Sequence, residues 1–307
     1  MTSSLPLRGA AAGIAIMLAA PTTGFGALIV QELFDGIAGP PPGVDSTLNG
    51  KGDTSSSIGM TGNWATNGST GINTASNFNV DGGLPGPSFT NGDAGGLWNA
   101  TASWNTSIYA TRALATTISF TTDQTLYFSA RLYNPGDTSM GIGLASGASG
   151  SSEFVGAGFS WNTATGIGGT PNDANNAAYI SYGTLDTNAG VYGIRAHEAA
   201  GSVNGYGLLV GRITISSTGA DLIDIKRYAP GSTIDDDPSL VSWSASDSVN
   251  SSMEASHMLL WLNGNNGNGE LDAFRLGQTW SDVTGVPETG STLLCALGLP
   301  FSIRRRR

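Results

Sequence analysis

Two carboxylates near the C-terminal end of the chain have a spacing that could support catalysis. Glu270 and Asp272 are one residue apart in the stretch ELDAFRLG, whose polar and apolar residues largely alternate. In a β-strand, residues two apart point to the same face of the sheet. Two carboxylates on one face are what a glycoside hydrolase needs, one as the nucleophile and one as its helper. These two residues therefore define the first candidate catalytic site.

The same stretch resembles the beginning of the Glu-x-Asp-x-x-Glu motif of laminarinase-type glycoside hydrolases, which use a concanavalin-like jelly roll. The resemblance implies a third carboxylate near Phe274 to Arg275, which would protonate the leaving oxygen. The chain has Arg275 there and no glutamate nearby. A missing general acid removes a contribution of about 10²–10⁴ to the rate. We therefore favour a structural role for Glu270 and Asp272 on a sheet surface among neighbouring charges, with the hydrolase as the alternative.

Other groups with catalytic or metal-binding chemistry are few. His197 and His257 are the two histidines, and no Gly-x-Ser-x-Gly elbow places a nucleophile for either of them. Two histidines without a thiol do not make a typical zinc site. The run Asp235-Asp236-Asp237 could offer oxygen ligands to Ca²⁺, but it lacks the spacing of a calcium loop. We expect a solvated turn there and no cofactor.

The aromatic residues suggest sugar binding as an alternative to catalysis. Rings beside polar loops can stack on sugars, although most tryptophans pack in cores or at sheet edges. The candidates for stacking are Trp161, Trp243, Trp261, Trp280, Tyr179, Tyr182 and Tyr192. A sugar-binding site would need one or two of these rings to face solvent together.

The segments that must position these residues have the period of two that is typical of strands. In LYFSARLY the residues that share one face are Leu126, Phe128, Ala130 and Leu132. In LLVGRITIS they are Leu209, Ile213 and Ile215. About ten or more such runs are separated by Gly, Asn and Pro clusters, a pattern that predicts an all-β, two-sheet antiparallel β-sandwich of the jelly-roll type.

Composition agrees with an exported all-β protein. Of 307 residues, 45 are glycine and 12% are charged, whereas 39% are hydrophobic, enough to bury a core. The terminal segments hold five of the 13 basic residues and one of the 23 acidic residues, so the middle of the chain is strongly acidic. An acidic surface repels phosphate, which disfavours nucleic-acid binding. With Cys295 as the single cysteine, no disulfide can form within the chain.

The N-terminal segment has the parts of a secretory signal peptide. Arg8 supplies the positive charge, the run from Gly9 to Ala20 is apolar, and Pro21 ends it before several small residues. We therefore expect residues 1–26 to be a signal peptide. The mature chain would begin near Ala27.

The C-terminal segment combines a proline-containing peptide, a short apolar run and four arginines. The run from Ser291 to Ile303 is shorter than the roughly 20 residues that span a bilayer. The arginines that follow it would hold the end of the chain on the cytoplasmic side. Pro287 favours an extended backbone, which a processing enzyme could engage.

This ending resembles the PEP-CTERM sorting signal and, more closely, its VPDSG-CTERM variant. The resemblance implies export by a Gram-negative bacterium, transient membrane association and processing by an exosortase. The residues that carry it are Val286, Pro287, Glu288, Thr289, Gly290, Arg304, Arg305, Arg306 and Arg307. The peptide also resembles the Leu-Pro-x-Thr-Gly signal of Gram-positive sortases, a rival interpretation that usually requires a longer hydrophobic span.

The middle of the chain, residues 28–284, resembles concanavalin-like or LamG-like jelly rolls. The resemblance rests on an opening strand in ALIVQELFDG, a strand in LLVGRI and a closing ELDAFRLGQTWSDV. It implies that the last strand lies beside the first, so that both ends of the domain meet at one edge. Residues 35–107 are expected to be loop-rich, and residues 286–307 to form the sorting signal.

Together these features predict an exported protein of the cell envelope, outer surface or extracellular matrix. We expect a non-enzymatic structural or glycan-adhesive sandwich. Its candidate partners are an exosortase and an extracellular polysaccharide. The alternative is a surface glycoside hydrolase of the laminarinase type that uses Glu270 and Asp272.

Overall fold

The computed structural model describes residues 27–34, 48–50, 52, 57–66, 73–75, 96–98, 108–134, 138–160, 177–185, 194–198, 205–229, 232–264 and 270–286. The predicted signal peptide lies outside these ranges, as do Pro287 and the rest of the predicted sorting signal. Trp161 and Tyr192 also lie outside them.

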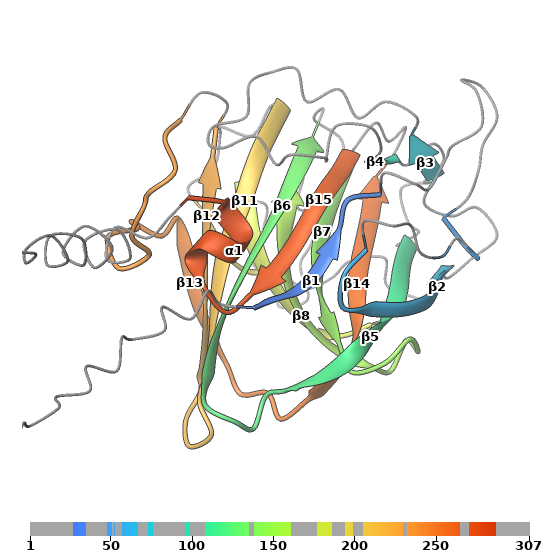
Figure 1. Ribbon diagram of the computed structural model, residues 1–307, viewed down its shortest axis with the longest axis horizontal. Helices are drawn as coiled ribbons and strands as arrows, with labels where there is room; N and C mark the ends of the chain where they lie inside the picture. Colours follow the sequence, from blue (N-terminus) through green and yellow to red (C-terminus); the bar gives the residue numbers. More distant parts are fainter. Residues whose placement is uncertain are drawn as a thin grey trace, which may run out of the picture.

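The strands of the described residues form two antiparallel sheets (Figure 1). The eight-stranded sheet has the order β13 (Ala245–Val249), β12 (Asp221–Tyr228), β11 (Gly205–Ile215), β6 (Gln124–Asn134), β15 (Glu270–Gly277), β4 (Gly96–Trp98) and β3 (Asn73–Ala75), with β1 (Leu28–Glu32) also paired to β15. The seven-stranded sheet has the order β10 (Ile194–His197), β9 (Ala177–Thr184), β8 (Glu153–Ser160), β7 (Thr138–Ala145), β14 (Glu254–Gly264), β5 (Ile108–Ser119) and β2 (Met60–Thr66). The predicted two-sheet sandwich is confirmed.

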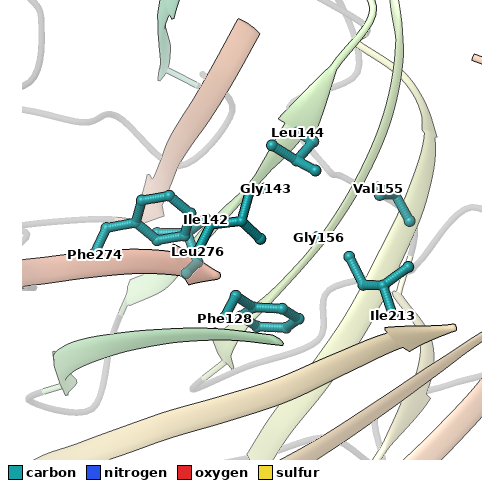
Figure 2. Close-up of a pocket in the computed structure, with 9 residues that line it drawn as sticks. All are labelled: Phe128, Ile142, Gly143, Leu144, Val155, Gly156, Ile213, Phe274 and Leu276. Atoms are coloured by element: carbon teal, nitrogen blue, oxygen red, sulfur yellow. The ribbon is translucent and has the colours of Figure 1, made fainter. Parts of the chain in front are cut away.

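The main hydrophobic core lies between the sheets and follows the predicted alternation. The side chains predicted to share one face of β6 all belong to it, as do Leu209, Ile213 and Ile215 of β11. Figure 2 shows side chains of both sheets, among them Phe128 and Ile142, around a small apolar void in this core. The void measures about 10 Å³, room for one water at most, and its apolar lining offers a water no partners. It is a packing defect of the core.

Each sheet also buries apolar side chains on its outer face. Leu208 and Val210 alternate with the core residue Leu209, so they lie on the outer face of the eight-stranded sheet. There they pack in a second cluster with Trp280 and Val283 of the short helix α1 (Trp280–Thr284). Helix α1 contacts β15 and β6, and it covers part of this face (Figure 1).

The first and last strands are neighbours, as the jelly-roll resemblance implies. Strand β1 pairs with β15, with Leu28 opposite Gly277. Val286, the first residue of the predicted sorting peptide, packs against the cluster beneath α1. Among the described residues, no helix combines the length and the apolar character needed to cross a bilayer.

Candidate functional site

The structure gives the predicted carboxylate pair a poor position for catalysis. Asp272 has no exposed surface, and its Oδ1 accepts a hydrogen bond from the backbone N–H of Ala273 at 2.6 Å. This differs from the expected place on a sheet surface, because the adjoining Ala273 packs with Trp280 and Val283 of α1 and this part of the outer face is covered. Glu270 pairs through its backbone with Tyr133 and Trp98, and its side chain lies outside the description.

Two arginines, Arg131 and Arg275, lie near the place where the laminarinase resemblance implies a third carboxylate. Asp272 is the register partner of Arg131 across β15 and β6, and Arg131 is almost fully buried. Burial, reinforced by the charge of Arg131, lowers the pKa of Arg275 to about 10. A guanidinium with this pKa remains protonated at neutral pH and does not serve as the general acid of a glycosidase. Asp272, Arg131 and Arg275 therefore have the charges of a largely buried ionic network, and they do not have those of a glycosidase active site.

A bulge in β15 accompanies this network. The register with β6 shifts between Asp272 and Arg275, and Ala273 has a positive φ of 50°. The bulge turns Phe274 into the core between the sheets, whereas Ala273 joins the cluster on the outer face. An alternating pattern cannot reveal such an extra residue, because each bulge resets the alternation.

The two histidines have structural partners. His197 Nδ1 lies 2.8 Å from the backbone oxygen of Glu198. The Glu198 carboxylate accepts from the N–H of Ala178 at 3.0 Å and from Arg227 Nε at 2.8 Å, so it links strands. These bonds join the segment of His197 and Glu198 to neighbouring strands.

His257 is bonded to its neighbour in the chain. Its Nδ1 lies 2.8 Å from Ser256 Oγ, and that hydroxyl donates to the backbone oxygen of Ser146 at 2.7 Å. A serine that donates its proton to a carbonyl is not poised as a nucleophile. Burial lowers the pKa of His257, which favours the neutral ring.

The acidic run 235–237 leads into a turn that is closed by a hydrogen bond from Leu240 N–H to the backbone oxygen of Asp237. Asp235 Oδ2 accepts from the Tyr228 hydroxyl at 2.6 Å and from Lys226 Nζ at 3.0 Å. Asp237 Oδ1 accepts from the N–H of Ser239. Within the described part of the chain, no three His, Cys, Asp or Glu residues gather as metal ligands.

Burial divides the aromatic candidates into two groups. Trp261, Tyr179 and Trp280 are at most 1% exposed, so they are packing residues. Trp243 and Tyr182 are half-buried and each carries an arginine over its ring, at 5.0 Å in both cases. Among the aromatic candidates that the structure describes, these two retain contact with solvent.

Trp261 explains several glycines on the outer face of the seven-stranded sheet. Its Nε1–H donates to the Tyr179 hydroxyl at 2.7 Å. A Cβ at Gly141 would lie 2.1 Å from the indole, and one at Gly156 would lie 2.7 Å from it. Gly141 and Gly156 therefore make room for a tryptophan.

The described residue group that best combines exposure with binding chemistry is what we call the Trp243 patch: Arg212, Asp224, Trp243 and Ser246. Arg212 donates to Asp224 Oδ2 from Nη2 at 2.6 Å and from Nε at 3.0 Å. Ser246 donates to Oδ1 of the same carboxylate at 2.6 Å. The guanidinium lies over the Trp243 ring, which meets Trp280 edge-on at 6.2 Å.

The patch brings together residues from β11, β12, β13 and the segment before β13. Sequence reasoning singled out Trp243 alone among them. A signal for the other residues was present in the sequence, because Arg212 and Asp224 are charged residues on the polar faces of two neighbouring strands. Only the pairing of β11 with β12 shows that they are directly opposite each other.

A second network anchors the segment that carries Trp243. Burial alone would raise the pKa of Asp235, but the hydrogen bonds from Tyr228 and Lys226 keep it below its ordinary value. The backbone oxygen of Asp235 also accepts from Trp280 Nε1 at 2.6 Å. Asp235 therefore fastens the segment 232–244 to both β12 and α1.

Comparisons with known proteins leave the family open. No family model matches the chain, and no curated protein matches its sequence. Among solved structures, the globular domain of T. cruzi calreticulin has a TM-score of 0.43 at 11% identity, covering 77% of this chain and 92% of that one.

Two further solved structures have lower scores. The VIP36 exoplasmic/lumenal domain, in its Ca²⁺/Man2-bound form, has a TM-score of 0.37 at 13% identity, covering 77% of this chain and 88% of that one. An engineered GH43 glycoside hydrolase has a TM-score of 0.34 at 12% identity, covering 60% of this chain and 34% of that one. At these scores, none of the three assigns this chain a ligand or an activity.

Proposed function

We propose that this protein is an exported, non-catalytic β-sandwich that binds polysaccharide at the cell envelope or in the extracellular matrix. The observation that carries the proposal is the contrast between its acids and its aromatics. Asp272 is buried, and Glu198 and Asp235 accept structural hydrogen bonds. Trp243, by contrast, is only half-buried and lies beside fixed polar groups.

The burial of Asp272 supports binding over hydrolysis. In a glycoside hydrolase both carboxylates reach the scissile bond, one on each side of it. A side chain with no exposed surface cannot contact a sugar without local opening of the sheet. The position where the laminarinase resemblance implies an acid holds Arg275.

Export is proposed from the two ends of the sequence. The segment 1–26 has the order of a signal peptide, and Val286 to Arg307 have the order of an exosortase signal. The pairing of β1 with β15 supports this arrangement, because it places the first and last strands of the described sandwich side by side.

The test is a binding and turnover assay on the protein as it is produced. Pull-down with immobilised polysaccharides measures binding, and release of reducing ends measures hydrolysis. We expect binding without release. Release that disappears in Glu270→Gln would overturn the proposal in favour of the hydrolase, and neither binding nor release would leave a purely structural protein.

A further inference from the structure

The Trp243 patch lies on the outer face of the eight-stranded sheet, outside the core between the sheets. Asp224 is buried and Arg212 is 26% exposed, so the carboxylate forms the floor and the guanidinium reaches the surface. Because Asp224 and Trp243 both hold Arg212, its position is set before any ligand arrives. Such preorganisation lowers the entropy cost of binding.

We infer that the Trp243 patch is the site at which this protein binds a neutral polysaccharide chain. The inference rests on the proposed function and adds the place and the ligand class. Sugar rings present apolar C–H faces and a belt of hydroxyls, so their sites pair an aromatic ring with a few fixed polar groups. The Arg212 guanidinium lies over the Trp243 ring, so a sugar would contact the outward side of this stacked pair, and Ser246 supplies a hydroxyl nearby.

The hydrogen bonds of Arg212 leave a donor for a ligand. Nε and Nη2 bond to Asp224, and Nη1 takes part in neither of those bonds. A guanidinium offers five N–H donors in a planar fork and no acceptor. The outward donors of Arg212 therefore suit the oxygen of a sugar hydroxyl.

Neighbouring residues extend the patch along the sheet. Leu222 is 38% exposed and lies two residues from Asp224 on the same face of β12. Its register partners are Thr214 on β11 and Ser248 on β13. An exposed apolar side chain between two hydroxyl residues can contact a second sugar unit of a chain.

The charge of the patch and of the whole chain favours a neutral polysaccharide over an acidic one as the ligand. Asp224 already neutralises Arg212, so the patch offers no surplus positive charge. The whole chain carries a formal charge of -10, which repels polyanions. A neutral chain such as a β-glucan is therefore the expected ligand.

The experiment measures binding of the full-length protein to laminarin, a neutral β-glucan, and to alginate, an acidic polysaccharide. We expect laminarin binding that falls about tenfold in Trp243→Leu and in Arg212→Met, because either change dismantles the stacked Arg212–Trp243 pair. Leu222→Lys, a change at an exposed position, should also weaken binding. Thermal unfolding of each variant establishes that it is folded.

Arg195→Met is the matched control. Arg195 lies over the Tyr182 ring at 5.0 Å, the same distance as in the patch, but on the other sheet. We expect it to bind laminarin like the wild type. Because Leu222 is exposed, its variant gives a result even where the loss of Trp243 prevents folding.

The outcomes separate the inference from the proposed function. Wild-type binding to laminarin that survives the Leu222 and Arg212 changes overturns the site and leaves polysaccharide binding intact. Binding to alginate but not laminarin overturns the neutral ligand. Binding to neither polysaccharide removes the proposed function itself, and the inference with it.

Discussion

The ionisable side chains of this protein are used mainly to join segments of the fold. Asp235 is a clear example, because it receives bonds from Tyr228 and Lys226 while its backbone receives one from Trp280. These bonds favour the charged carboxylate and lower its pKa in the folded protein despite partial burial. A carboxyl with a lowered pKa links folding to pH.

Asp235→Asn tests this link. Because the folded pKa of Asp235 lies below its ordinary value of 3.8, the stabilisation is present above 3.8 and is lost as pH falls through the folded pKa. The variant should be less stable than the wild type at neutral pH, and the difference should shrink in acid. Urea unfolding at neutral pH and below pH 3.8 measures it. The exposed neighbour gives a control, Asp236→Asn, and equal pH profiles for Asp235→Asn and wild type would contradict the prediction.

Gly141 is a second residue whose identity the tertiary structure explains. A Cβ there would lie 2.1 Å from the Trp261 ring and 2.7 Å from the backbone oxygen of Ala157. Gly141→Ala should therefore lower the free energy of unfolding by about 1–3 kcal/mol through overpacking. In the control Gly219→Ala, the nearest atom is Ser216 Oγ at 3.4 Å, an ordinary contact. Equal urea midpoints for the two variants would show that the indole moves aside freely.

Helix α1 shows how a short element depends on its caps and on packing. Five residues are too few for a helix that is stable alone, so α1 relies on Trp280 and Val283 in the outer cluster. Its start is fixed by a capping box, in which Thr279 Oγ1 accepts from the N–H of Asp282 and Asp282 Oδ2 accepts from the N–H of Thr279. Gly285 ends it in the left-handed conformation.

Thr279→Ala removes one half of this capping box. We expect a loss of about 1 kcal/mol in the free energy of unfolding, typical of a lost N-cap. Thr279→Ser keeps the oxygen and should restore most of it. The Trp280 environment, followed by near-UV circular dichroism, reports on the helix directly. An alanine variant as stable as the serine variant would mean that packing alone positions α1.

Over the whole molecule, a buried ion pair fastens the two sheets together. Arg112 of β5 and Glu32 of β1 belong to different sheets, and Arg112 Nη1 lies 2.7 Å from Glu32 Oε2. Both side chains are almost fully buried. Burial raises the pKa of Glu32, although the N–H of Phe34 and Arg112 oppose the shift.

Arg112→Met leaves the Glu32 carboxylate buried without its cation. We expect a loss of about 3–5 kcal/mol at neutral pH, the usual cost of breaking a buried pair. The loss should shrink as pH falls, because protonation of Glu32 removes the buried charge. The double variant Glu32→Gln/Arg112→Met should be more stable than the single one at neutral pH. A pH-independent loss would assign the effect to packing instead.

The proposed sorting signal is tested on the whole protein in cells. Deleting Arg304 to Arg307 should release the protein into the medium or leave it unprocessed, since the arginines would no longer hold the C-terminal run in the membrane. Cell fractionation and mass spectrometry of the mature C-terminus measure this. Unchanged fractionation with an unchanged C-terminus would count against the signal.

The strand pattern was predictable from the sequence because alternation is local. Each of β6 and β11 places the expected residues in the core, and runs separated by turn residues are enough to indicate a two-sheet sandwich. The two ends of the chain likewise predict export from short, contiguous signals. The deletion of Arg304 to Arg307 tests the C-terminal one.

Only the tertiary structure decided which candidate side chains are exposed and which residues interact with one another. Asp272 and Trp261 look like surface candidates in the sequence, yet both are buried by segments distant in the chain. Arg212 and Asp224 become a pair only when β11 and β12 align, and Trp243 joins them through the anchored segment before β13. The physical reason is that burial and cross-strand contacts depend on long-range packing, whereas alternation depends only on the neighbours of each residue.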